Sequence, residues 1–152
     1  MNGSSRVVSL VLQAAFWIPA LYLAIHLRMG DFEGEWMAIE RFDGFKGFLS
    51  ALKCARDLAD AHGIQTPILI LTDNAMLRDH LGHEGLLNGF VTTTYSAVHT
   101  KQLEGDEAFR AMMSAFLDLR LLAEAICIIS CPSGFPHTAV QWGQHGCALT
   151  VS

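Results

Sequence analysis

The sequence predicts an α/β fold in which a mainly parallel sheet is flanked by helices. Short apolar runs typical of buried strands alternate with longer segments of helical periodicity. Three of the apolar runs end in clusters of polar residues, as expected where parallel strands release side chains into a binding crevice. With 152 residues, 51% of them hydrophobic and 16% charged, the chain suits one domain with a large core.

The first apolar stretch, residues 7–25, contains no charged residue and allows two interpretations. It could be a signal anchor or a short membrane-spanning helix. Alternatively, a helix over 6–17 ends before Pro19, and a buried strand follows over 20–27. Gln13 and Pro19 favour the second interpretation, because a membrane span needs about 20 continuous apolar residues.

In the middle of the chain, the sequence pattern predicts a polar loop over 29–43, followed by two helices and two strands. Apolar residues recur every three or four positions over 44–62, which predicts a helix, and Gly63 is suited to end it. The apolar run 67–71 predicts a strand, which ends in Thr-Asp-Asn at 72–74. The same reasoning predicts, in order, a helix over 75–81 and a strand over 89–93.

The last third begins with the strongest helical pattern, over 106–125, whose broad apolar stripe we interpret as core packing. The stripe consists of Phe109, Met112, Met113, Phe116, Leu117, Leu121 and Leu122. The elements predicted after this helix are a buried strand over 125–130 that breaks at 131–134, a helix over 135–142 and a closing strand over 147–151.

Net charge and histidine spacing exclude two classes of function. The net charge of −5 provides no basic surface for DNA or RNA, so nucleic-acid binding is not expected. His80 and His83 lie three residues apart, and His137 and His145 lie near Cys147. None of these spacings matches a strong metal signature, so no metal site is expected.

The four cysteines form no Cys-x-x-Cys pair, which argues against a zinc ribbon or a thioredoxin-like site. Cys54 falls in a helical pattern and Cys127 in an apolar strand pattern, so both are interpreted as small buried hydrophobic residues. If the compartment is oxidising, Cys131 and Cys147 are the pair that we expect to form a disulfide.

The segment 24–31 carries the clearest functional pattern, since an apolar run ends abruptly in His-Leu-Arg-Met-Gly-Asp. Side chains alternate between the two faces of a strand, so His26 and Arg28 point the same way. An arginine at the carboxyl end of a strand indicates an anionic ligand, because its planar guanidinium matches phosphate or carboxylate oxygens.

Two other polar clusters follow predicted strands. Asp73 and Asn74 precede a helix, where such residues commonly cap the N-terminus. Ser133 and Gly134 open the last helix, whose free N–H groups and dipole favour an anion, and Thr138 could face the same place. Ordinary N-capping by Ser133 explains the same residues, and the two roles are compatible.

Three blocks of the chain, in this order, resemble the C-terminal half of the GDP-fucose-dependent fucosyltransferases, especially the protein O-fucosyltransferases. They are AIHLRMGDF at 24–32, ILILTDN at 68–74 and LDLRLLAEAICIISCPSGFPHTA at 117–139. The resemblance implies one half of a GT-B arrangement, in which two Rossmann-like domains face each other and the C-terminal one holds the nucleotide sugar. Residues 1–152 would form that single nucleotide-sugar-binding domain.

The resemblance also implies what this domain would lack. The chain has no Gly-Arg-x-Gly-Asn segment, which in the family belongs to the N-terminal domain. The acceptor-binding domain is therefore expected to be absent. The chain would be a fragment, a half that needs a partner chain, or an inactive remnant.

The resemblance assigns roles to the first cluster. Arg28 is the catalytic candidate, because it would stabilise the charge that grows on the departing diphosphate. His26 would contact phosphate or orient Arg28, or it would be a hydrogen-bonded structural histidine. Asp31 would position Arg28, cap the following loop, or act as a base toward the acceptor hydroxyl.

The remaining candidates would complete the donor site. Asp73 would contact the base or ribose of the nucleotide, if it is not simply a helix cap. Asp118 lies in an otherwise apolar helix segment and needs a partner, because an unpaired buried carboxylate is costly. The resemblance indicates the guanine edge as that partner; the alternatives are a salt bridge to Arg120 or Arg110, or exposure. The phosphate-binding candidates are Ser133, Gly134 and Thr138.

The implied reaction is transfer of fucose from GDP-fucose to a hydroxyl of a protein or glycan acceptor, with inversion at the sugar carbon. GDP-fucose would be the donor substrate, and no metal cofactor is expected. The family implies the secretory pathway. Two alternatives stay open: a non-catalytic nucleotide-sugar-binding or interaction domain, and an unrelated phosphate-handling α/β enzyme.

Overall fold

The computed structural model describes residues 21–29, 44–82, 87–93, 104–144 and 146–151, and these ranges contain one five-stranded sheet. Its strands are β1 (Leu23–Leu27), β2 (Ile68–Thr72), β3 (Phe90–Val91), β4 (Cys127–Ser130) and β5 (Ala148–Thr150). The helices are α2 (Gly44–His62), α3 (Ala75–Gly82), α4 (Gly105–Glu124) and α5 (Gly134–Gly143). The strand order is β3-β2-β1-β4-β5, and every neighbouring pair is parallel, which confirms the predicted α/β, Rossmann-like fold.

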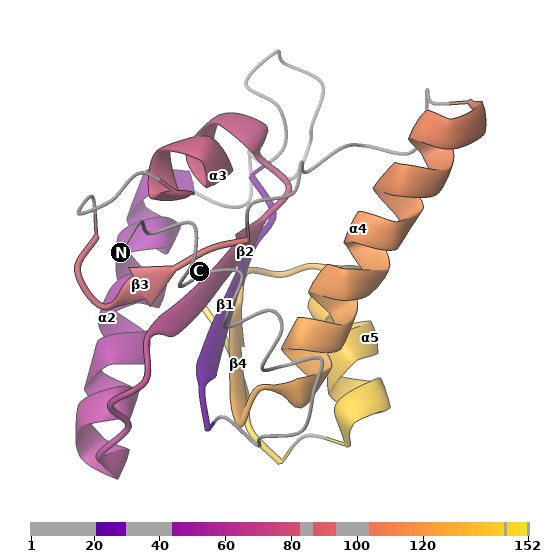
Figure 1. Cartoon of the computed structure of the whole chain (residues 1–152). Helices are drawn as coiled ribbons and strands as arrows, with labels where there is room; N and C mark the ends of the chain where they lie inside the picture. The colour runs from indigo at the N-terminus through magenta and orange to yellow at the C-terminus, as the bar shows by residue number, and fades with distance from the viewer. Residues whose placement is uncertain (1–20, 30–43, 83–86, 94–103, 145, 152) are drawn as a thin grey trace.

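Helices cover both faces of the sheet, with α2 and α3 on one side and α4 and α5 on the other (Figure 1). The central strand β1 is therefore buried throughout. Its residues Leu23, Ile25 and Leu27 pack with the small residues of α2 that face the sheet, namely Ala51, Ala55 and Ala59. On the other face, the hydroxyl of Tyr22 donates a hydrogen bond to the carbonyl of Leu121 in α4, at 2.6 Å.

The bounds predicted from local sequence patterns lie close to those of the elements in the structure. The predicted helix 44–62 matches α2, and Gly63 ends it with a φ of +64°, which lets the N–H of Ile64 bond back to the carbonyl of Ala59 at 2.8 Å. The predicted strand 89–93 is shorter than expected. β3 stops at Val91 because the next residue, Thr92, bonds to β2 through its hydroxyl, which donates to the carbonyl of Ile70 at 2.7 Å.

Most of the apolar stripe of α4 is not core, which corrects the interpretation of that pattern: of its seven residues, Leu121 and Leu122 are buried and the other five are exposed. Its side chains Phe109, Met112, Met113, Phe116 and Leu117 are exposed by 59%, 44%, 44%, 52% and 39%. The sheet meets the face that contains Ala111, which was outside the predicted stripe, together with the stripe residues Leu121 and Leu122. Because the helix is apolar around most of its circumference, periodicity could not tell which face packs. The amino-terminal half of α4 projects past the sheet (Figure 1).

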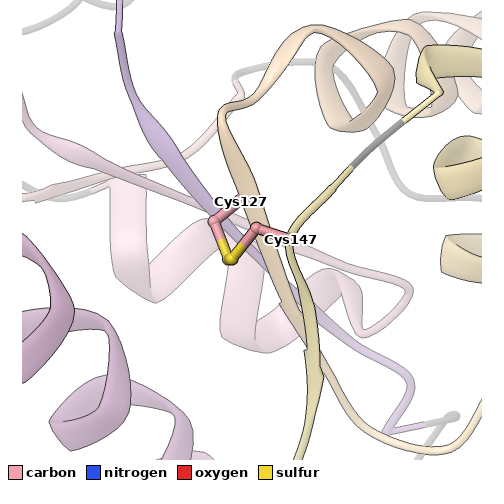
Figure 2. The surroundings of a disulfide bond; sticks show 2 residues. All are labelled: Cys127 and Cys147. Carbon is pink, nitrogen blue, oxygen red and sulfur yellow. A yellow bond between two sulfur atoms is a disulfide. The ribbon is translucent and has the colours of Figure 1, made fainter.

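The expected pairing of the cysteines was wrong. The disulfide joins Cys127 to Cys147, with 4.7 Å between their Cα atoms (Figure 2). The reason is strand register: Ala148 pairs with Ile128, which brings the residue before each of them to the same end of β4 and β5. Cys131 lies at the opposite end of β4 as a buried free thiol, and Cys54 is also free.

Several predictions from the sequence fall outside the described residues. They are the helix over 6–17, most of the possible anchor over 7–25, most of the loop over 29–43, and the candidates Asp31, His83 and His145. Among the helices in the described ranges, none combines the length and the apolar character that crossing a membrane requires.

Candidate functional site

The candidate site lies at the carboxyl edge of the sheet, between β1 and β4. From β1 the sheet extends through β2 in one direction and through β4 in the other, so the strand order reverses at this point. Ligands of open α/β sheets bind at such a switch point, outside the carboxyl ends of the strands. Arg28 follows β1, and Ser133 follows β4 at the start of α5, so both lie at the expected edge.

Arg28 is held at this edge by its backbone and by a carboxylate. Its backbone N–H donates to the sulfur of Cys131 at 3.0 Å, and its Nε lies 4.0 Å from Oδ2 of Asp73. Oδ1 of Asp73 accepts the N–H of Met29 at 2.7 Å. Asp73 therefore joins the end of β2 to the end of β1. The Arg28 side chain stays 34% exposed, so it can be reached by a ligand.

Asp73 and Asn74 have different roles in the structure. Asn74 is the helix cap, because its Oδ1 accepts the N–H of Leu77 at 2.8 Å. Asp73 instead contacts the segment after β1, as described above. Of the two adjacent polar residues, the structure thus brings Asp73 to Arg28 and gives the capping role to its neighbour.

His26 is buried at the same edge, at 6% exposure, and its ring stacks on that of Phe135 with 5.1 Å between the ring centroids. Its Nδ1 has no hydrogen-bond partner among the described residues. Burial, and then the nearby positive charges of Arg28 and Arg78, lower the pKa of His26 from its usual 6.5 to about 3. The ring is therefore neutral at physiological pH, with its Nδ1 buried at the carboxyl edge of the sheet.

This burial predicts a pH-dependent stability. The folded-state pKa of His26 is lower than the unfolded-state value, so the unfolded chain binds more protons as pH falls from 6.5 toward 3. We therefore expect the free energy of unfolding to fall by about 1.4 kcal/mol for each unit by which the pH is lowered in that window, because of His26. Urea unfolding of the wild type and of His26→Phe between pH 7 and pH 4 measures it. Parallel losses in the two proteins would contradict the expectation.

The amino end of α5 contributes the third part of the site. Ser133 is its N-cap, and its hydroxyl oxygen accepts the N–H of Phe135 at 3.4 Å. Gly134 is the first helical residue. The exposed hydroxyl of Thr138 donates to the carbonyl of Gly134 at 3.2 Å, one turn back in the same helix. Because this cap uses the N–H of Phe135 and Pro136 has none, it is mainly the helix dipole that favours an anion here.

Asp118 has a partner that the sequence did not indicate. Its Oδ2 lies 2.8 Å from Nη2 of Arg78, and the two side chains are 13% and 5% exposed. Arg120, which had been considered as the partner, pairs instead with Glu124 in an exposed i,i+4 contact at 2.8 Å. The salt bridge to Arg110 is likewise replaced by the pair with Arg78. No pattern in the sequence singles out Arg78, because it lies 40 residues before Asp118.

Side chains that could bind a metal ion do not cluster in the described part of the chain. Within the ranges that the structure describes, no group of three or more histidine, cysteine, aspartate or glutamate side chains could hold a metal ion. Nδ1 of His80 donates to the carbonyl of Met76, at 2.8 Å, in an exposed position on α3.

No protein-family model matches the chain, and no curated protein matches it. Two similar solved structures are of NodZ alpha-1,6-fucosyltransferase, one co-crystallised with GDP and one soaked with GDP-fucose. The first has a TM-score of 0.49 and 16% identity, and the second has 0.44 and 17%. Each match covers 90% of this chain and 40% of the solved chain, so this chain spans less than half the length of those structures.

Proposed function

We propose that this chain is the donor-binding domain of a fucosyltransferase-like glycosyltransferase, which binds GDP-fucose through its diphosphate. One observation carries the proposal. At the switch point of the sheet, a buried neutral imidazole, whose Nδ1 has no hydrogen-bond partner among the described residues, lies near the partly exposed Arg28. A buried polar atom without a partner costs about 1 to 3 kcal/mol, so a ligand atom is expected to supply the missing hydrogen bond to His26.

The charges at this edge favour a diphosphate. Arg28 and Arg78 both lie close enough to His26 to lower its pKa, so two guanidinium groups act on the same small region. Asp73 and Asp118 partly balance them. The amino end of α5 adds the positive end of its helix dipole from the other side of the switch point. The guanidinium of Arg28 is the group with enough exposure to bind phosphate oxygens in a bidentate manner.

The proposed reaction places Arg28 at the leaving group. The acceptor oxygen attacks the sugar carbon from the face opposite the diphosphate, the carbon–oxygen bond to the β-phosphate breaks, and the electron pair stays on GDP. Arg28 stabilises that growing charge, and such preorganised electrostatic terms commonly contribute a few kcal/mol. The acceptor proton would pass to a base, for which Asp31 stays a prediction outside the described residues. No metal is required for these steps.

The identity of the sugar and base rests on the three sequence blocks that resemble the fucosyltransferases. Asp118 is proposed to face the guanine edge while Arg78 holds its Oδ2. Binding of GDP compared with ADP tests whether that carboxylate recognises the base. The Cys127–Cys147 disulfide supports the proposed secretory location, because disulfides persist in oxidising compartments.

A non-catalytic nucleotide-sugar-binding domain is the second candidate function. The observation that favours it concerns the carboxylates at the site: both Asp73 and Asp118, in the described part of the chain, are paired with an arginine. Neither is therefore placed to accept the proton of an acceptor hydroxyl. In this case the chain would bind the donor, and the acceptor and the base would come from another domain or chain.

Calorimetry with GDP, GDP-fucose and ADP tests the donor-binding proposal. We expect GDP and GDP-fucose to bind with similar affinity in EDTA, and ADP to bind about tenfold more weakly, because base-edge hydrogen bonds would be lost. The absence of GDP binding by the folded wild type would overturn the proposal. Hydrolysis of GDP-fucose, and transfer to hydroxyl acceptors, then separates an enzyme from a binding domain.

A further inference from the structure

Arg78, on the first turn of α3, joins three separate parts of the molecule. Its side chain is 5% exposed. The guanidinium donates to the carbonyl of Thr72 from Nε at 3.1 Å and from Nη2 at 2.5 Å, and to the hydroxyl of Thr93 from Nη1 at 2.8 Å. Nη2 also donates to Asp118. One buried side chain therefore connects the end of β2, the segment after β3 and the middle of α4.

The short length of β3 explains why a side chain is needed here. β3 pairs with β2 at two positions only, so the later carbonyls of β2 on that side have no strand to bond to. Buried backbone carbonyls are nearly always satisfied. The hydroxyl of Thr92 satisfies the carbonyl of Ile70, and the guanidinium of Arg78 satisfies that of Thr72. Arg78 thus takes the place of the missing strand at the last residue of β2.

That last residue is adjacent to the donor site. Thr72 is followed by Asp73, which accepts the N–H of Met29 and lies 4.0 Å from Nε of Arg28. The backbone that carries the Asp73 carboxylate is therefore held in place by the guanidinium of Arg78. Arg78 and Arg28 are connected through two residues, Thr72 and Asp73, although Arg78 itself is buried behind them.

We propose that Arg78 is a positioning residue for the donor site, which holds Asp73 and, through it, the segment of Met29 and Arg28. The inference rests on the proposed function and deepens it. The role requires a guanidinium, because its planar fork donates in three directions at once. A lysine would keep the charge opposite Asp118 but could not make the same set of bonds.

The test is Arg78→Lys with two measurements, one of which does not depend on a nucleotide. We expect the Kd for GDP to rise about tenfold, as is usual when a group that orients a binding residue is lost. We also expect the amide hydrogen of Met29 to exchange about tenfold faster, because its acceptor Asp73 is no longer held. Wild-type values of both in folded Arg78→Lys would overturn the proposal.

Arg56→Lys is the matched control. Arg56 also lies on a helix, donates to a backbone carbonyl (Asn88, 2.7 Å) and stacks on Phe90, at 4.9 Å from the ring centre, but at the amino end of β3. The same substitution there should leave GDP affinity and Met29 exchange within about twofold of wild type. If Arg56→Lys changed them as much as Arg78→Lys, the effect would be general loosening, and the positioning role would be wrong.

A double-mutant cycle tests the route through Asp73. If Arg78 acts through this carboxylate, Arg78→Lys should change GDP affinity by less than about twofold in an Asp73→Ala background. If the two substitutions instead lowered GDP affinity independently, so that their fold-changes multiplied, Arg78 would not act through Asp73. If Arg78→Lys does not fold, Thr93→Val removes one of its acceptors, and we then expect a smaller shift of the same sign; no shift would contradict the proposal.

These outcomes separate the two proposals. A folded wild type that does not bind GDP would overturn the proposed function. The exchange rate of the Met29 amide would still decide whether Arg78 positions the carboxyl edge of the sheet.

Discussion

Replacing Asp118 with alanine is expected to lower the free energy of unfolding by about 3 to 5 kcal/mol, the usual cost of breaking a buried ion pair by removing one of its members. The Arg78 guanidinium would stay 5% exposed and would lose the carboxylate that lies 2.8 Å away. Its bonds to Thr72 and Thr93 are made to neutral oxygens, so they cannot take the place of the Asp118 carboxylate. Urea unfolding at pH 7 measures the loss.

The same helix provides the control for this prediction. Glu124 forms an ion pair with Arg120 at the same distance of 2.8 Å, but both side chains are more than one third exposed. Exposed pairs of this kind contribute little, because water screens the two charges, so Glu124→Gln should have little effect. Equal losses for the two variants would show that burial does not decide the contribution of the Arg78–Asp118 pair.

Arg28→Ala is expected to weaken GDP binding about tenfold or more, because a charge-assisted hydrogen bond to phosphate contributes about 1.5 to 3 kcal/mol. The side chain is 34% exposed, so its removal should change the stability of the fold little. Calorimetry with GDP measures the affinity, and thermal unfolding confirms that the variant stays folded.

Two further variants sharpen the Arg28 experiment. Arg28→Lys keeps the charge but not the planar pair of donors, so we expect an affinity between those of wild type and Arg28→Ala. Arg56→Ala removes an exposed arginine far from the carboxyl edge and should not change GDP affinity. Wild-type affinity of folded Arg28→Ala would remove this residue from the donor site, and with it the proposed stabilisation of the leaving group.

Most of the fold follows from local patterns. The predicted helix 44–62 coincides with α2, and the predicted strand 67–71 is within one residue of β2. Residues close together in the sequence determine these elements. The spacing of apolar residues specifies both of them, and Gly63, with its positive φ, specifies where α2 ends. The doubly covered sheet follows, because apolar strands such as β1 need helices on both faces.

The part of the site that follows the strand ends was also predictable. His26, Arg28, Asp73 and Ser133 could be predicted to lie at one edge, because polar residues follow apolar runs and parallel strands bring their carboxyl ends together. Arg78 was missed because it lies inside a helix, where an arginine ordinarily indicates an exposed face. The burial of Arg78 depends on β3 being only two residues long. The β-branched residues at 91–93 predicted a longer strand.

The sequence by itself determined the alternation of strands and helices, and the edge at which an anionic ligand is expected, because both depend on residues close together in the chain. Only the tertiary structure decided which face of α4 packs, that Cys147 bonds to Cys127, and that Asp118 pairs with Arg78. Each of these depends on strand register or helix rotation, which brings together residues 20 to 40 positions apart or selects one of two apolar faces.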